Sequence, residues 1–163
     1  MTVRALVAAD LEQASRVCMA AFMGAVADSL IPLGIETFSR IASVEGFRAR
    51  MAQDNLMLAC EQEGRIVGIA ELKEGRHVAM LFVDPAAQQR GIGKALMAAM
   101  IEQARVEVLT VSASLSSVPA YERYGFVCTA DRAESSGLRY QPMEMRLTAP
   151  VLLHAVQATR SRR

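Results

Sequence analysis

The residues with the clearest chemical potential lie between Leu81 and Ala104, in the stretch LFVDPAAQQRGIGKALMAAMIEQA. An apolar run ends at a proline, Gly91 and Gly93 follow, and apolar residues then recur at helical spacing. Glycine allows a ligand to approach the backbone closely, and the first amides of a helix have no acceptor within the helix. A loop that enters a helix through glycine is therefore suited to hold a phosphate group.

Two common phosphate-binding motifs do not match this loop. A dinucleotide-binding fingerprint needs a third small residue at the position of Leu96. A Walker-type loop needs a glycine at the position of Gln88 and a hydroxyl residue after Lys94, where this chain has Ala95. An ordinary turn between a strand and a helix would also explain the glycines, so the pair alone does not decide the function.

The elements around the loop are predicted from periodicity and turn signals. Residues 2–22 predict a short strand and a helix capped near Asp10, and residues 31–53 predict one or two short helices. Residues 55–85 contain three apolar runs separated by EQEG and KEG, which predicts an antiparallel meander. The remaining expected elements are a helix from Gly91 to about Gln103, a strand at 106–114, a short helix at 116–125 and closing strands at 126–130 and 139–147. This order predicts an α+β domain in which helices cover a sheet.

The composition excludes several classes of protein. A chain of 163 residues with 52% hydrophobic residues and no run long enough to cross a bilayer predicts one soluble domain. The net charge of +1 gives no electrostatic reason to expect a nucleic acid or a membrane as a partner. Cys18, Cys60 and Cys128 lack metal-ligand spacing, so we expect no metal site and reduced thiols. With no secretory signal visible, a cytoplasmic location is expected.

Two motifs together resemble a known family. Gln88 completes the arrangement Gln-x-x-Gly-x-Gly, which resembles the acyl-CoA pyrophosphate loop of the GNAT N-acetyltransferase superfamily. SVPAYERYGF, residues 117–126, resembles a later GNAT motif in which a short helix carries a tyrosine and ends at Gly-Phe. The order of the expected elements is also similar, which predicts a GNAT domain over residues 1–147 and a C-terminal extension with a basic tail over 148–163.

The resemblance implies a mostly antiparallel mixed sheet flanked by helices, and transfer of an acetyl group from acetyl-CoA to a primary amine. The alternative is a GNAT-fold module that binds CoA without turnover. The backbone of Leu81, Phe82 and Val83 would pair with pantetheine. Ser114 takes the place of an asparagine that contacts pantetheine in many members, and a hydroxyl can still form a hydrogen bond. The residues expected around the pyrophosphate are Gln88, Gln89, Arg90, Gly91, Ile92, Gly93 and Lys94.

The resemblance also implies catalytic roles. Tyr121 matches the family's tyrosine, whose phenol would protonate the departing CoA thiolate. His77 occupies the place where some members carry a carboxylate base, and Glu71 is a second candidate because it is expected on the same strand face as Val67 and Ile69. Water could serve in place of either side chain. Ala120 stands where many members of the family have an aromatic residue. The smaller side chain leaves room near the acyl group, so transfer of an acyl chain longer than acetyl is an alternative.

The acceptor and the oligomeric state are less defined by the sequence. The resemblance implies an acceptor site built from about residues 21–37 and 131–140, which leaves a small-molecule amine and a peptide amine as alternatives. Four charged residues could select the acceptor or could simply be surface residues: Asp28, Glu36, Arg132 and Arg139. The apolar segment PVLLHAV, residues 150–156, is expected to cover either the edge of its own sheet or the partner subunit of a homodimer.

Overall fold

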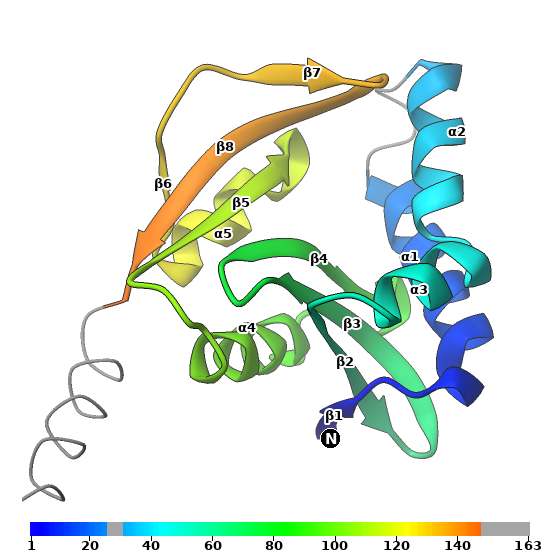
Figure 1. The fold of residues 1–163 in the computed structure, drawn as a ribbon. Coiled ribbons are helices and arrows are strands. Elements are labelled where there is room, and N and C mark those ends of the chain that lie inside the picture. The colour runs from blue at the N-terminus through cyan, green and yellow to red at the C-terminus, as the bar shows by residue number, and fades with distance from the viewer. Residues whose placement is uncertain (26–30, 148–163) are drawn as a thin grey trace, which may run out of the picture.

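The computed structural model describes residues 1–25 and 31–147 (Figure 1). Its strands form one eight-stranded sheet in the order β1-β2-β3-β4-β5-β8-β6, with β7 paired to β8. The strands are β1 (Thr2–Ala5), β2 (Asn55–Gln62), β3 (Arg65–Lys73), β4 (His77–Val83), β5 (Val108–Ser114), β6 (Val127–Cys128), β7 (Ala133–Ser135) and β8 (Leu138–Arg146). The helices are α1 (Leu11–Ala25), α2 (Pro32–Ile41), α3 (Val44–Met51), α4 (Ile92–Glu102) and α5 (Val118–Tyr124), with single 3-10 turns at Ala8–Asp10, Pro85–Ala87 and Leu115–Ser117.

The sheet is mostly antiparallel, with one parallel pair at its centre. β4 and β5 run parallel and pair only at two positions, His77 with Thr110 and Val78 with Val111. The pairs β1–β2, β2–β3, β3–β4, β5–β8, β6–β8 and β7–β8 are all antiparallel. The predicted meander corresponds to β2, β3 and β4, and the predicted mixed sheet flanked by helices is confirmed.

Helices cover both faces of the sheet, as Figure 1 shows. On one face, α4 and α5 contribute Leu96, Met100 and Tyr121 to a buried apolar cluster. On the other face, α1 and α3 contribute Phe22 and Phe47 to a second cluster. Two apolar cores of this kind require strands whose side chains alternate between buried faces.

Two bulges change which side chains share a face. In β3 the register shifts so that Val67 is an extra residue between the pairs Glu61–Ile66 and Cys60–Gly68. Val67 therefore packs with the α4 cluster, whereas Ile69 belongs to the cluster under α1 and α3. The expectation that Glu71 shares a face with both Val67 and Ile69 is wrong for Val67, because strict alternation fails at the bulge.

The second bulge lies in β4. Glu71 pairs with Met80 and Leu72 pairs with Val78, so Ala79 is the extra residue. Val78 packs in the α4 cluster and Met80 in the opposite one. The bulge thus falls next to the point where β4 and β5 stop pairing.

The structure adds one strand that the sequence pattern did not predict. β7 forms a hairpin with β8 through Ser136 and Gly137, which both have positive φ angles, 51° and 81°. Two-residue turns of this kind join adjacent antiparallel strands. Among the described helices, none combines the length and apolar character needed to cross a membrane. The segment 150–156 lies outside the described residues.

Candidate active site

The centre of the sheet opens where β4 and β5 separate (Figure 1). After Val78 and Val111, neither strand pairs with the other, although β4 continues to Val83 and β5 to Ser114. Their outer sides are occupied by β3 and β8, so within the described residues the facing edges carry backbone groups without a strand partner. An extended ligand can form hydrogen bonds to such an edge as an added strand does. The predicted pantetheine contacts, Leu81 to Val83, lie on this open edge.

The chain leaves β4 through a compact turn and enters α4 at the expected glycine. Asp84 begins the turn, because its carboxylate accepts a hydrogen bond from the Ala86 amide at 3.0 Å. Gln89 and Gly91 then adopt left-handed backbone conformations, with φ of 66° and 77°. A Cβ at Gly91 would meet no atom within 4 Å, so glycine serves the backbone angle there rather than close packing.

The start of α4 presents backbone donors toward this loop. The first hydrogen bond of the helix runs from the Ala95 amide to the Gly91 carbonyl at 3.0 Å. The amides of Ile92, Gly93 and Lys94 precede Ala95, the first amide that donates within the helix, so they have no acceptor inside α4. Ile92 buries its side chain, whereas the side chains of Gln88, Gln89, Arg90 and Lys94 are exposed. These positions suit backbone recognition of an anion, with Lys94 available as a nearby positive charge.

Tyr121 is on α5 and belongs to the same buried apolar cluster as Ile92 of α4. Its side chain is 6% exposed, and its ring makes edge-on contacts with Phe126 at 5.4 Å and Tyr124 at 5.9 Å between centroids. Burial raises the pKa of the Tyr121 phenol above its ordinary value, and the neighbouring Tyr124 adds to the increase. The phenol is therefore protonated at neutral pH, as a proton donor must be.

Ser114 ends β5 on the other side of the opening. Its hydroxyl donates a hydrogen bond to the Ser117 hydroxyl at 2.8 Å, which in turn donates to the Ser114 carbonyl at 2.8 Å. This pair fixes the turn between β5 and α5, the turn that delivers Tyr121.

His77 lies at the closed end of the opening. Its Nδ1 is 2.8 Å from the Thr110 hydroxyl, on the strand that it pairs with. Since Val78 and Val111 pack toward α4, His77 and Thr110 lie on the opposite face of the sheet. Burial, followed by the positive charges of Arg76 and Lys73, lowers the pKa of His77. The imidazole is therefore neutral near pH 7 and can accept a proton.

Glu71 lies in a different environment from His77. It is 1% exposed, and both of its carboxylate oxygens accept from Arg50 Nε, at 3.0 and 3.1 Å. Arg50 also donates to the Ile41 carbonyl at 2.8 Å and lies 5.0 Å from the centre of the Phe47 ring. Burial raises the pKa of Glu71, and the Arg50 charge opposes that increase. This geometry favours a structural ion pair that ties α2 and α3 to β3.

The family model described as "Acetyltransferase (GNAT) domain" matches residues 26–147 of the 163-residue chain. The chain belongs to the GNAT acetyltransferase family. Among solved structures, a GCN5-related N-acetyltransferase from Rhodopseudomonas palustris superposes with a TM-score of 0.80 and 25% identity, covering 90% of this chain and 95% of that one. The PaiA N-acetyltransferase from Thermoplasma acidophilum, solved with coenzyme A, gives a TM-score of 0.72 and 22% identity over 90% and 98% of the two chains.

Curated relatives match this GNAT domain over shorter segments. The peptidyl-lysine N-acetyltransferase YiaC of Escherichia coli K12 is 51% identical over 37 residues, which are 23% of this chain and 25% of YiaC. The uncharacterized N-acetyltransferase YafP of the same organism is 38% identical over 74 residues, which are 40% of this chain and 48% of YafP. The matched segments thus span about half or less of these relatives.

The GNAT domain brings α2 against the β7–β8 hairpin, on the face of the sheet opposite α4. The Thr37 hydroxyl donates to the Ser136 carbonyl at 2.8 Å, and a Cβ on Gly34 would collide with the carbonyl of Gly137. The two segments expected to build the acceptor site therefore meet. Of the four charged residues considered for acceptor selection, Glu36, Arg132 and Arg139 are exposed, and Asp28 lies outside the described residues. Arg139 forms an ion pair with Glu134, with 3.8 Å between Nε and Oε2.

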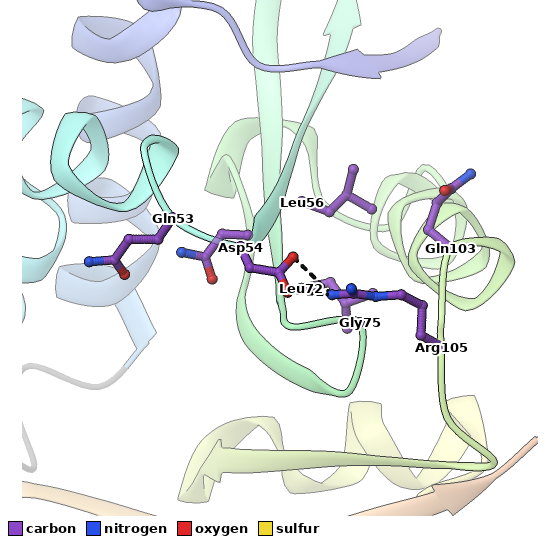
Figure 2. A pocket seen from close by; sticks show the side chains of 8 residues that line it. Gln53, Asp54, Leu56, Leu72, Gly75, Gln103 and Arg105 are labelled. Carbon is purple, nitrogen blue, oxygen red and sulfur yellow. Dashed lines mark hydrogen bonds and ion pairs between the residues drawn. The ribbon is translucent and has the colours of Figure 1, made fainter.

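A separate hollow lies at the other end of α4 (Figure 2). The Arg105 side chain extends across it and forms an ion pair with Asp54 at 2.7 Å, and both side chains are exposed. The 11-residue helix α4 places this hollow about 16 Å from the glycine loop. It is lined by Gln53, Asp54, Asn55, Leu56, Leu72, Gly75, Gln103 and Arg105, and it has no part in the candidate active site. No group of His, Cys, Asp and Glu within the described ranges could hold a metal ion.

Sequence reasoning missed Thr110, the hydrogen-bond partner of His77. The sequence contains no local signal for it, because the two residues are 33 positions apart and meet only through the parallel register of β4 and β5.

Proposed function

We propose that this chain is an acetyl-CoA-dependent N-acetyltransferase that acetylates a primary amine. The observation that carries the proposal is the continuous path formed by the open β4–β5 edge and the first turn of α4. The edge supplies backbone groups for pantetheine, and the helix supplies amides for the pyrophosphate. Residues 1–147 form the catalytic domain in this proposal.

The reaction requires one proton to leave nitrogen and one to reach sulfur. The amine nitrogen forms a bond to the thioester carbonyl carbon, and the carbon–sulfur bond then breaks. An alkylamine with a pKa of about 10.4 must lose a proton before it attacks. His77 lies where β4 and β5 still pair, and its neutral imidazole accepts that proton directly or through water. Tyr121 donates its proton to the departing thiolate.

The acceptor enters, in this proposal, between α2 and the β7–β8 hairpin, on the face that carries His77. The YiaC name supports a peptide lysine as one acceptor class, and small amines form the second class. A cytoplasmic homodimer belongs to the same proposal. The free cysteines Cys18, Cys60 and Cys128 support a reducing compartment, and the apolar segment 150–156 supports association.

The proposal is tested with purified full-length protein. Calorimetry should show binding of CoA, and a panel of lysine peptides, polyamines and aminoglycosides should include at least one amine that releases free CoA from acetyl-CoA. CoA binding without turnover of any amine would support the non-catalytic module instead. Absence of CoA binding would contradict both functions.

A further inference from the structure

Tyr124 brings a second phenol to the cofactor path, one helical turn after Tyr121. Its hydroxyl lies over the first turn of α4, since a Cβ built on Gly93 would be 2.5 Å from Tyr124 Oη. Cβ atoms in proteins do not approach other heavy atoms that closely. Gly93 has no positive φ angle, so close approach by the tyrosine, rather than backbone conformation, explains the glycine.

The Tyr124 hydroxyl lies beside Gly93, in the turn of α4 whose first amides have no acceptor within the helix. No hydrogen bond joins it to another residue in the ranges 1–25 and 31–147, and no fully buried side-chain N or O atom in those ranges lacks a partner, so this hydroxyl is accessible to solvent. Burial raises the pKa of this half-buried phenol, so it keeps its proton at neutral pH. A phenol O–H beside the amides of a helix N-terminus adds a side-chain donor for an anion.

We propose that Tyr124 donates its hydroxyl hydrogen to the pyrophosphate of CoA. The inference rests on the proposed function, because it requires CoA to occupy the β4–α4 path. The rings of Tyr124 and Tyr121 are in edge-on contact, with 5.9 Å between their centroids and an interplanar angle of 84°. Because of this contact, a Tyr124 side chain held by the cofactor also restricts the Tyr121 ring. Tyr124 is then a binding residue for CoA and a positioning residue for Tyr121.

The first test compares two ligands with Tyr124→Phe, which keeps the ring and removes the hydroxyl. The affinity for CoA, measured by calorimetry, should fall about tenfold, as expected for loss of a hydrogen bond to a charged group. The affinity for S-acetylpantetheine, which lacks the pyrophosphate, should not change. Thr129→Val, which removes an exposed side-chain hydroxyl just after β6, outside the cofactor path and the acceptor segments, is the control and should leave CoA affinity unchanged.

The outcomes separate this inference from the proposed function. If the parent does not bind CoA, both are wrong. If the parent binds CoA and Tyr124→Phe binds it equally well or more tightly, only the inference is overturned. An equal loss for CoA and S-acetylpantetheine also overturns it, because the effect would then come from packing.

The second test concerns Gly93. Gly93→Ala should lower the melting temperature, because the new Cβ meets Tyr124 Oη. Adding Tyr124→Phe removes that oxygen and leaves the ring carbon Cζ at 3.8 Å, an ordinary contact, so the double variant should regain the melting temperature but not the CoA affinity. A Gly93→Ala protein as stable as the parent, with unchanged CoA affinity, would overturn the inferred position of the hydroxyl.

Discussion

At the scale of single residues, burial moves two pKa values in the directions that the reaction needs. The pKa of Tyr121 is raised and the pKa of His77 is lowered, so that both groups are neutral near pH 7. One group then holds a proton to donate, and the other holds a lone pair to accept one. Desolvation, the largest cause in both cases, disfavours the charged form of each.

Tyr121→Phe should lower kcat by ~10²- to 10⁴-fold with a small change in KM, because the proton is needed in the transition state. The ring contacts with Phe126 and Tyr124 remain, so thermal stability should change little. Steady-state kinetics with a confirmed acceptor, and a melting curve, check both parts. An unchanged rate, with the chemical step shown to limit turnover, would mean that Tyr121 only packs.

His77→Gln should lower kcat/KM by about 10²-fold and remove one acidic limb of the pH profile. In the parent, activity requires neutral His77 and is lost as the pH falls through its folded pKa. That limb should lie below the ordinary histidine value of about 6.5, because burial, Arg76 and Lys73 lower the pKa. Profiles of kcat/KM from pH 5 to 9 measure it. A variant that keeps the same limb would assign the base to water or to another group.

At the scale of elements, the β4–loop–α4 unit joins a bulged strand to a helix through left-handed residues. The bulge at Ala79 lies where pairing with β5 ends, and Gly91 turns the chain so that α4 begins with its amides free. A short local segment therefore supplies both the strand edge and the helix N-terminus of the cofactor path. Its conformation uses left-handed backbone at Gln89 and at Gly91.

Gly91→Asp should abolish measurable CoA binding, because it places a negative charge beside the expected phosphates. The side chain meets open space, but the left-handed backbone should cost about 1 kcal/mol in unfolding free energy. Gly64→Asp is a matched control: its φ of 75° is similar, it also faces open space, and it lies in the β2–β3 turn. Calorimetry should show that Gly64→Asp binds CoA as tightly as the parent and that Gly91→Asp does not. Normal affinity in folded Gly91→Asp would contradict the loop assignment.

Glu71→Gln should lower the unfolding free energy by about 2 kcal/mol, because it leaves the Arg50 charge without its partner. This value is below the range for fully buried pairs, since the Arg50 side chain is 22% exposed. Urea unfolding measures the loss, and kcat of the folded variant should stay near that of the parent. Unchanged stability with a large fall in kcat would instead make Glu71 the base.

At the scale of the whole molecule, the sheet consists of two parts that diverge from a narrow junction. One part contains β1 to β4 and the other contains β5 to β8, and only two residue pairs join them directly. On the face opposite α4, α2 contacts the β7–β8 hairpin of the second part through Thr37 and Gly34.

The full chain should sediment as a homodimer at micromolar concentration, at twice its mass of 17.7 kDa. The expectation rests on the apolar segment 150–156, whose burial between subunits would be favourable. Leu152→Asp with Leu153→Asp should shift the sedimentation to that of the single chain. A parent that sediments at 17.7 kDa would favour burial of the segment within one chain.

Features that depend on nearby residues were predictable from the amino-acid sequence. The spacing of Gln88, Gly91 and Gly93 is local, and so is the position of Tyr121 before Gly125 and Phe126. Periodicity is read over windows of about 11 to 18 residues and turn residues act over fewer, so the meander and the helices were predictable. The short strand β7 was missed because its three residues, Ala133 to Ser135, contain no apolar run.

Contacts between distant segments follow from the folded arrangement of the whole chain. Glu71 meets Arg50 across 21 positions and His77 meets Thr110 across 33 positions, while Tyr124 reaches over Gly93 from another helix. The bulges at Val67 and Ala79 also follow from strand pairing. Register and helix packing are set by the joint burial of two apolar faces, a property of the whole chain that no short stretch of sequence contains.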